Sequence, residues 1–570
     1  MSSKQRLELT WIGKENRPRL EPRILLEDPE KSYHAKQRVT ENDIFDNRLI
    51  FGDNLLALKA LEQEFAGKVK CVYIDPPYNT GSAFEHFDDG IEHSLWLSLM
   101  RDRLELLWRL LGPKGTLWVS IDDYEMPYLR VLLDETCGRG AFIAANVWQK
   151  RYSRENRGAI GDVHEYVIVY AKDPGDFKVS RGLLPLTAEQ SKVYKNLTND
   201  VRGPWRTIPI TAQAGHATPS QFYTITGPTG KQFDPPPGNC WRYSRPVFEK
   251  LVAEGRIYFG KDGNGQPTTI RYLSEVEGTV PWTWWPHDEV GNTDEAKKET
   301  LSLIPGGSVF DTPKPERLIH RILHISTLPG DLVLDSFAGS GTTGAVAHKM
   351  GRRWIMVELG EHCHTHIIPR MKKVIDGEDE GGITKAVEWK GGGGFRYFHI
   401  APSLLEKDRF GNLIISKQYN AAMLTEAMCK VMGFTYAPSD ELYWQQGRST
   451  ENDFLYVTTQ TLTRDQLAKL SDEVGDSRSL LVCCAAFRGK ADAFPNLTIK
   501  KIPSVVLTKC EWGHDDYSLN VANLPKAAPP AEAVPMDAAK PSTPKQARRR
   551  SAAGAAQPNL FPSEEQGGAE

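Results

Sequence analysis

The sequence predicts an α/β fold whose parallel sheet is built from two separated parts of the chain. Short apolar runs alternate with segments of helical apolar spacing, first between residues 46 and 174 and again between residues 308 and 376. A glycine-rich turn at residues 337–343 follows one of these runs, as in a Rossmann-like unit. The chain of 570 residues is also too long for one compact domain, so we expect further domains around this core.

The first part of the core reads as strand and helix in turn. A strand before Gly52 leads into a helix marked by Leu55, Leu58 and Leu61. The continuous apolar run "VKCVYI" predicts a strand covered on both faces. The helical segment "SLWLSLMRDRLELLWRLL" follows, and then the strands "GTLWVSID" and "EYVIVYAK". This order predicts βαβ units.

Between the two parts the alternation is lost, and the sequence becomes rich in Pro, Gly, Thr and Trp. We expect an inserted, irregular or β-rich domain there, with most of its tryptophans in its core. Some of them, with Arg206, Arg242 and Arg245, are alternatives for contacting a bound partner. The predicted divisions are an N-terminal arm (1–45), a catalytic half (46–174), an inserted recognition domain (175–307), a cofactor half (308–376), an accessory domain (385–520) and a disordered tail (521–570).

Composition gives no indication of a secreted, disulfide-bonded or membrane protein. Lys and Arg number 70 against 73 Asp and Glu, so the overall charge gives no sign of an acidic partner. Eight cysteines without a CxxC pair indicate reduced thiols in a cytoplasmic protein. The start lacks the apolar segment of a secretory signal, and no apolar run approaches the ~20 residues that span a bilayer. We therefore expect a cytoplasmic protein without a membrane segment.

The glycine-rich turn, "FAGSGTT", has the features of a nucleoside site. Gly339 and Gly341 allow a sharp turn between strand and helix, where backbone N–H groups can bind a ligand. Glu358 ends the next strand about 20 residues further on, where a Rossmann-like unit binds ribose hydroxyls. The third glycine of the dinucleotide pattern and a P-loop lysine are both missing, which disfavours NAD and ATP.

The stretch "DPPY" places polar groups that can bind a ligand at the end of an apolar strand. Asp75 stands where parallel sheets present their ligands, and the two prolines remove N–H donors while leaving the Pro76 carbonyl free to accept. A carboxylate and a carbonyl suit an exocyclic amino group, which has two N–H donors. Tyr78 offers a flat face for a base taken out of its stack.

These two motifs, in this order, resemble the β group of amino-methylating DNA methyltransferases. "FGDN" around Asp53, "HEYVIVYAK", "FDTPKPERLIHRIL" and "VELGEH" resemble further motifs of that group. By motif the resemblance covers about residues 46–376. A longer-range likeness, including "LELTWIGKE" near the start and the extra C-terminal region, is to the modification subunits of type III restriction systems, with an orphan methyltransferase as the alternative. The resemblance also implies association with the nucleoid.

The resemblance implies transfer of a methyl group from S-adenosylmethionine to adenine N6 of a flipped base in double-stranded DNA. DPPY, in place of SPPY, favours adenine; cytosine N4, an RNA substrate or a catalytically inactive DNA-binding subunit are the alternatives. The implied catalytic residues are Asp75, Pro76, Pro77 and Tyr78. The implied cofactor residues are Asp53, Thr312, Lys314, Asp335, Phe337, Gly339, Ser340, Gly341, Thr342 and Glu358.

Partners are predicted from shorter signals. The basic loop "WQKRYSRENRG" indicates phosphate contacts or else a solvated surface, its cations being Lys150, Arg151, Arg154 and Arg157. The family context adds a helicase-nuclease restriction subunit and a homodimer. The tail motif "QPNLFP" resembles sliding-clamp ligands, with Gln557, Leu560 and Phe561 as its contacts.

One cluster imitates a metal site. His362 and His366 have the i, i+4 spacing of a zinc pair, with Cys363 and His364 between them. Neither HExxH nor CxxC accompanies them, so we expect structural or solvent roles and no metal.

Overall fold

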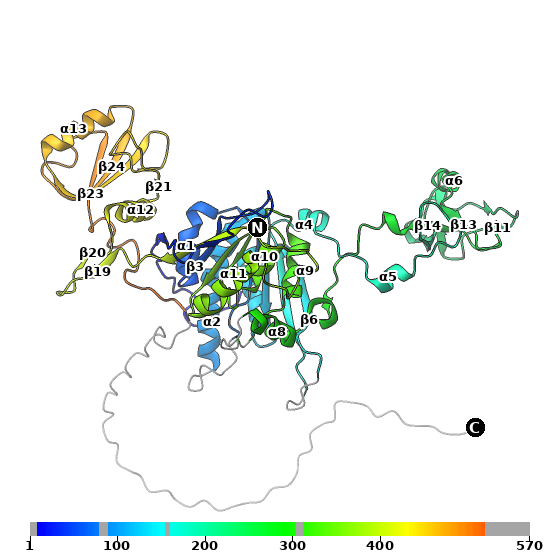
Figure 1. The fold of residues 1–570 in the computed structure, drawn as a ribbon. Coiled ribbons are helices and arrows are strands. Elements are labelled where there is room, and N and C mark those ends of the chain that lie inside the picture. Colours follow the sequence, from blue (N-terminus) through cyan, green and yellow to red (C-terminus); the bar gives the residue numbers. More distant parts are fainter. Residues whose placement is uncertain (1–7, 79–88, 154–159, 304–309, 311, 519–570) are drawn as a thin grey trace, which may run out of the picture. The chain divides into compact units, whose positions relative to one another are not determined.

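The computed structural model describes residues 8–78, 89–153, 160–303, 310 and 312–518 (Figure 1). Its largest element is a sheet of eleven strands in the order β1-β18-β3-β17-β16-β4-β5-β7-β6-β15, with β2 also paired to β18. The strands are β1 (Leu25–Glu27), β2 (Tyr33–His34), β3 (Asn47–Phe51), β4 (Val69–Ile74), β5 (Leu111–Ile121), β6 (Phe142–Gln149), β7 (His164–Ala171), β15 (Trp284–Trp285), β16 (Leu332–Asp335), β17 (Arg353–Glu358) and β18 (Gly394–Ile400).

The two separated parts of the chain meet in the middle of this sheet. Val333 and Leu334 of β16 pair in parallel with Cys71 and Val72 of β4. Strands β3, β17, β16, β4 and β5 form a parallel series, and β7 lies antiparallel to both β5 and β6. The predicted α/β core with a split sheet is therefore confirmed.

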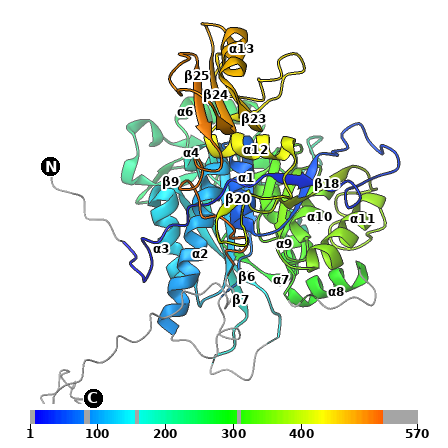
Figure 2. The same cartoon turned by 90° about the vertical axis from the view of Figure 1, so that its left-hand side faces the viewer.

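Helices cover both faces of the sheet, which explains why its strands are apolar throughout. Alternate β4 residues serve two cores: Val72 and Ile74 face one, and Cys71 and Tyr73 the other. Figure 2 shows α2 and α3 on one side and α9, α10 and α11 on the other. The covering helices are α1 (Asn54–Phe65), α2 (Asp89–Leu110), α3 (Met126–Leu133), α4 (Pro174–Ser180), α7 (His287–Val290), α8 (Thr293–Leu303), α9 (Glu316–Ser326), α10 (Thr342–Lys349) and α11 (Ile368–Asp376).

Strand pairing extends the core across three of the predicted domain boundaries. Strand β18 pairs in parallel with β3, from Phe395 opposite Asn47 to His399 opposite Phe51, so the core continues past the expected end at 376. Strands β1 and β2 of the predicted N-terminal arm pair with β18. Strand β15 pairs with β6, so the inserted region returns to the core before 307. Each strand satisfies backbone groups that a shorter sheet would leave unpaired at its edge.

The inserted region is β-rich, as predicted, and builds its own small cores. Trp205 and Trp241 are buried, and Trp285 is buried against the main sheet, whereas Trp282 and Trp284 are exposed. The elements are α5 (Ala188–Lys192), β8 (Trp205–Pro209), β9 (Thr211–Gln213), β10 (Ile225–Thr226), β11 (Gln232–Phe233), β12 (Asn239–Trp241), α6 (Arg245–Ala253), β13 (Ile257–Tyr258) and β14 (Thr268–Tyr272).

The region after β18 is also of mixed α/β structure and contains a five-stranded sheet in the order β21-β22-β23-β24-β25. The apolar run "LLVCCAAF" lies in β24. The elements are β19 (Leu405–Lys407), β20 (Leu413–Ile415), α12 (Ala421–Met432), β21 (Thr435–Tyr436), β22 (Gly447–Arg448), β23 (Asp453–Leu462), α13 (Arg464–Val474), β24 (Ser479–Phe487) and β25 (Leu497–Lys501).

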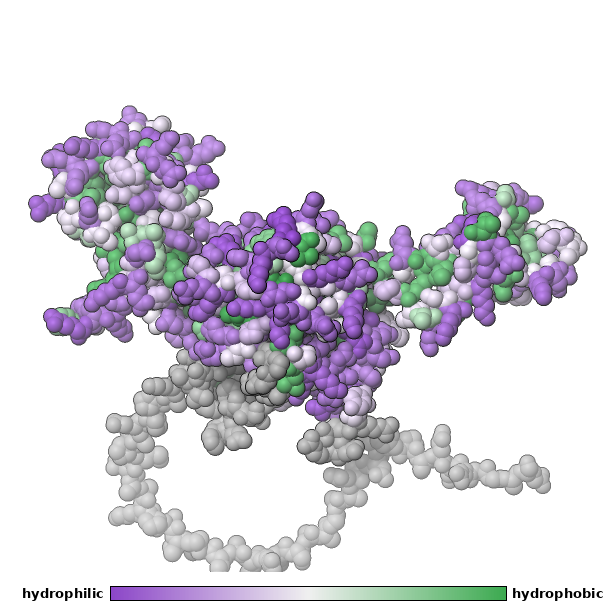
Figure 3. Space-filling model, viewed as in Figure 1, coloured by the Kyte–Doolittle hydropathy of each residue, from purple (hydrophilic) through white to green (hydrophobic). Residues whose placement is uncertain are grey.

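Several expectations about the whole chain can be compared with the described residues. All eight cysteines are free thiols, as predicted, and Cys71 in β4 is fully buried. Among the described helices, none combines the length and apolar character needed to cross a bilayer. Hydrophilic residues cover most of the face shown in Figure 3. The predicted contacts Arg154, Arg157, Gln557, Leu560 and Phe561, and the tail as a whole, lie outside the described residues.

Candidate active site

A cavity of about 670 Å³ opens where the two parts of the sheet meet. Strands β4 and β16 are neighbours, and their carboxyl ends carry Asp75 and Asp335 into the same space. This is the edge at which parallel sheets bind ligands. The lining includes residues predicted from both parts, namely Asp53, Asp75, Pro76, Pro77, Tyr78, Thr312, Lys314, Asp335, Phe337, Gly339, Ser340, Thr342 and Glu358.

Asp75 is held by a lysine from the other half of the core. The Lys314 ammonium group lies 2.8 and 2.7 Å from the two Asp75 oxygens, and the Tyr78 hydroxyl donates to Oδ1 at 2.8 Å. Lys314 was expected at the cofactor, and in the structure its ammonium group binds the Asp75 carboxylate. Burial raises the pKa of Asp75, Lys314 lowers it, and Glu165 raises it again.

A second carboxylate shares these donors. Glu165 of β7 accepts from the Tyr78 hydroxyl at 3.0 Å and lies 3.6 Å from the Lys314 ammonium group. Its other oxygen lies 3.4 Å from Lys150, which also pairs with Asp162 at 2.8 Å. Lys150 was predicted on an exposed basic loop, but it is buried and belongs to this network. Arg151 is exposed beside it and lines the cavity.

The proline pair is fixed by a helix on one side of the sheet. The indole N–H of Trp96, in α2, donates to the Pro77 carbonyl at 2.7 Å. Trp96 is fully buried, so this contact anchors the stretch after β4 to the apolar core. The backbone that carries Asp75 and Pro76 therefore has a rigid support.

The glycine-rich turn has the backbone geometry that its sequence predicts. Gly339 and Gly341 have φ angles of +53° and +79°, a conformation that other residues adopt only with strain. The Gly339 N–H donates to the Glu358 carboxylate at 2.8 Å, and Gly360 donates to the other oxygen at 2.9 Å. Glu358 thus lies at the turn, on the strand next to it, as the nucleoside-site pattern requires.

Asp335 lies at the centre of this half of the cavity. Its carboxylate accepts from the backbone N–H of Phe337 at 2.9 Å and from the Thr343 hydroxyl. Burial raises its pKa to about 7. Next to it, the buried hydroxyl of Ser336 has no hydrogen-bond partner within the described residues. A buried polar atom without a partner at a cavity wall marks a place where a polar ligand can bind.

Ser340 and Thr342 stabilise the start of α10 from inside. Their hydroxyls lie 3.1 Å apart, and Arg370 donates to the Thr342 hydroxyl at 2.9 Å. Both residues are buried, so they shape the turn as well as line the cavity. Thr312, in contrast, is exposed at the cavity mouth.

Asp53 caps a helix as well as lining the cavity. One oxygen accepts from the N–H groups of Leu55 and Leu56 at the start of α1. The other accepts from the backbone N–H of Tyr517 at 2.9 Å and faces Arg103 at 3.3 Å. These contacts keep the carboxylate buried and leave it little room to bind a ligand directly.

Sequence reasoning missed Glu165, Ser336 and Arg103. Glu165 stood in a quoted motif, "HEYVIVYAK", but an acidic residue at the start of a strand does not reveal which face it occupies. Arg103 lies in a helical segment with many charges, and only its burial singles it out. Ser336 lies between two predicted site residues and could have been found by its position.

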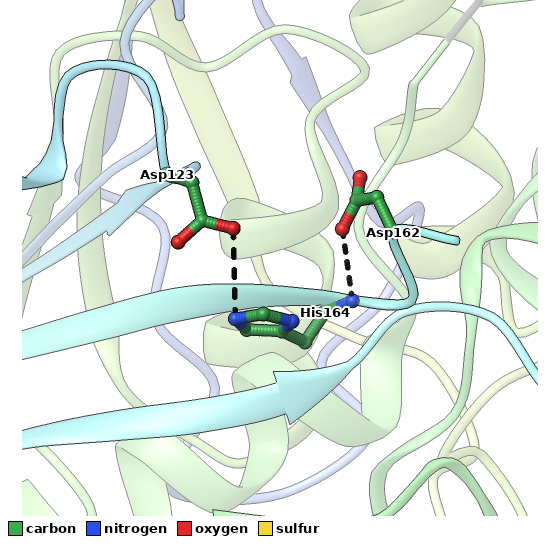
Figure 4. A group of neighbouring side chains, drawn as sticks. All are labelled: Asp123, Asp162 and His164. Atoms are coloured by element: carbon green, nitrogen blue, oxygen red, sulfur yellow. Dashed lines mark hydrogen bonds and ion pairs between the residues drawn. The ribbon is translucent and has the colours of Figure 1, made fainter. Parts of the chain in front are cut away.

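Two groups of histidine and acidic residues could be taken for metal sites, but their contacts within the protein account for them. Asp123 and Asp162 flank His164 at the start of β7 (Figure 4), but both carboxylates are exposed and Asp162 pairs with Lys150. In the predicted cluster, His362 pairs with Glu358 and His364 contacts Tyr397. Their imidazoles therefore serve separate partners, and we assign no metal to either group.

Comparison with known proteins found a matching family model and several similar proteins. A family model described as DNA methylase matches residues 69–369, more than half of the chain. The StyLTI Mod subunit of a type III restriction-modification enzyme from Salmonella typhimurium is 35% identical over 54% of this chain and 50% of its own length. The type II methyltransferase M.EcaI from Enterobacter cloacae is 32% identical over 55% and 67%, respectively. The EcoPI Mod subunit of Escherichia phage P1 is 30% identical over 61% and 62%. The chain thus spans about half the length of the StyLTI subunit.

Proposed function

Because the chain belongs to the DNA methylase family, we propose that it transfers a methyl group from S-adenosylmethionine to the N6 amino group of adenine in double-stranded DNA. One observation carries the proposal: Asp75 and Tyr78 from one half of the core line the same cavity as Gly339 and Glu358 from the other. An acceptor for an amino group and a turn suited to a nucleoside therefore face one space.

The donors and acceptors around the turn fit S-adenosylmethionine. Glu358 would hold the ribose hydroxyls, because its carboxylate already lies at the Gly339 N–H. Asp335 and the unpartnered Ser336 hydroxyl would take the polar methionine end of the ligand. When bound, this cofactor supplies a methyl group on a sulfonium, and the electron pair of the breaking bond stays with sulfur.

The residues of the other half would prepare the base nitrogen. Asp75 and the Pro76 carbonyl would each accept one N–H of the amino group, which frees the nitrogen lone pair to form the new C–N bond. Tyr78 would support the flipped base through its ring. The nitrogen then loses a proton, for which the Asp75 carboxylate is the acceptor that this network supplies.

The assignment of adenine as the target base depends on the motif DPPY, which favours adenine N6 over cytosine N4. Expression in a methylation-deficient host, followed by digestion of the host DNA and mass spectrometry of the nucleosides, tests it. We expect N6-methyladenine, absent when Asp75 is replaced by Asn. Detection of N4-methylcytosine would keep the mechanism and change the target base. Absence of both methylated nucleosides would favour an RNA substrate or a catalytically inactive DNA-binding subunit.

Partners form the remaining part of the proposal. The names of the StyLTI and EcoPI relatives as Mod subunits of restriction enzymes support association with a helicase-nuclease subunit. Co-purification with the product of a neighbouring restriction gene tests this, and light scattering tests the homodimer. Deletion of residues 557–561 should abolish capture by the sliding clamp if the tail motif binds it.

A further inference from the structure

A carboxylate that was not among the predicted site residues lies close to Asp75. Glu165 is only 8% exposed, and its Oε2 atom lies 3.0 Å from the Tyr78 hydroxyl and 3.6 Å from the Lys314 ammonium group. The same two groups are the donors to Asp75. Glu165 and Asp75, from neighbouring parts of the sheet, therefore compete for one set of donors.

Tyr78 and Lys314 together have too few donor hydrogens to fill every acceptor position on Asp75 and Glu165. The Tyr78 hydroxyl has a single hydrogen for two acceptors. Asp75 Oδ1 can receive Tyr78 and Lys314 together, which fills its two lone-pair directions, while Oδ2 receives only Lys314. One direction on Oδ2 therefore stays open toward a base amino group.

The charges around this pair determine how strong an acceptor Asp75 is. Because one ammonium group binds both of its oxygens, the Asp75 carboxylate attracts a further positive charge only weakly. A second anion nearby, Glu165, offsets part of the ammonium charge and makes Asp75 a stronger acceptor. Lys150 binds the far oxygen of Glu165 and keeps this second anion in place. The other titratable groups that face the pair are Tyr73, Asp122 and Asp335, from β4 and from the ends of β5 and β16.

We propose that Glu165 is a positioning residue for Asp75: by sharing Lys314 and the Tyr78 hydroxyl, it keeps the Asp75 carboxylate a strong acceptor for the amino group of the target base. This role rests on the proposed function. The base nitrogen gains positive charge as the new bond forms, and a second fixed anion close to Asp75 stabilises that charge.

The test is single-turnover methyl transfer as a function of pH, with the full-length protein and DNA that carries the target site. Glu165→Gln keeps the shape of the side chain and removes its charge, and Lys314→Met removes the opposite charge. Matched controls are Glu62→Gln and Lys59→Met, an ion pair on α1 outside the cavity. Equilibrium binding of S-adenosylmethionine is measured for every variant.

The two charges act on Asp75 in opposite directions, which gives a specific expectation. Glu165 raises the pKa of Asp75 and Lys314 lowers it. Transfer needs the ionised carboxylate, so Glu165→Gln should move the acid limb of the rate profile to lower pH and Lys314→Met should move it to higher pH. Glu165→Gln should also slow transfer by about tenfold at its plateau, with cofactor affinity unchanged and both controls behaving as the unaltered protein.

Other outcomes would overturn this role. A Glu165→Gln protein with the rate and acid limb of the unaltered protein would show that Glu165 has no influence on Asp75. Limbs that move in the same direction in both variants, or loss of cofactor affinity in Glu165→Gln, would indicate a structural role only. Failure of the unaltered protein to transfer methyl groups would reject the proposed function itself, and this role with it.

Discussion

The ammonium group of Lys314 lies within 2.8 Å of both carboxylate oxygens of Asp75, although 239 positions separate the two residues in the chain. This ion pair joins the half of the core that carries DPPY to the half that carries the glycine-rich turn. Both side chains are largely withdrawn from solvent, at 7% and 23% exposure. Substitution of Asp75 therefore affects the charge balance of the site as well as its chemistry.

Asp75→Asn should abolish methyl transfer while leaving cofactor binding in place. The amide cannot accept a proton and offers an N–H where the base amino group needs an acceptor, so we expect a loss of at least about 1000-fold. Incorporation of labelled methyl groups into DNA measures this. Asn is preferred to Ala because an empty site would leave the Lys314 ammonium group buried without its partner. Transfer at the original rate would remove Asp75 from the mechanism.

Cofactor affinity should increase as pH rises through about 7. Burial raises the pKa of Asp335 to about 7, so its carboxylate is mainly protonated below that pH, and the cationic amino group of the ligand favours the ionised form. Titration calorimetry between pH 5.5 and pH 8.5, roughly spanning this pKa, measures the dependence. Asp335→Asn should bind more weakly and without this rise; an equally steep rise in that variant would assign the titration to another group.

Gly339→Ala should weaken cofactor binding by about tenfold. The residue has a φ of +53°, which costs an alanine roughly 1–2 kcal/mol, and an added Cβ would lie 3.3 Å from Phe310. Gly351→Ala is the matched control, because its φ is +69° and an added Cβ there meets no atom within 4 Å. Equal losses of affinity in the two variants would show that backbone strain in general, and not the turn, is responsible.

Glu316→Gln should destabilise the fold without touching the cavity. Glu316 accepts from Lys349 at 2.7 Å, from Arg370 at 2.9 Å and from the Ile383 N–H at 3.0 Å, and all three partners are buried. Breaking such a buried network costs about 3–5 kcal/mol in the free energy of unfolding. Urea denaturation measures the loss, with Glu62→Gln as a partly exposed control. A loss below about 1 kcal/mol would indicate that solvent replaces these contacts.

The same residue predicts a dependence of stability on pH. Burial by itself raises the pKa of Glu316, but Arg370 and Lys349 lower it below its usual value. A carboxylate with a lowered pKa in the folded state contributes stability above its unfolded pKa and loses that contribution as pH falls. The difference in unfolding free energy between the unaltered protein and Glu316→Gln should therefore shrink below about pH 4. A constant difference down to pH 3, well below the usual Glu pKa of about 4.3, would contradict this.

Local patterns predicted much of the core because its strands are buried on both faces. The run "VKCVYI" and the turn at Gly339 and Gly341 depend on nearest neighbours and on backbone geometry, and the structure places both as expected. A single sheet built from two separated parts was also predicted, and the pairing of β16 with β4 joins these parts. In contrast, β18 lies after a run of glycines that reads as a linker, and its pairing with β3 leaves no local signature.

By itself the sequence determined which residues the proposed chemistry uses: Asp75 and Tyr78 after one strand, and the glycines and Glu358 around another. Spacing along the chain was enough for these, because strand ends and tight turns are fixed by a few adjacent residues. Only the tertiary structure decided the partners of Asp75. Lys314 and Glu165 reach it from distant segments, and the direction of a buried side chain depends on the register of strands and helices that the local pattern does not specify.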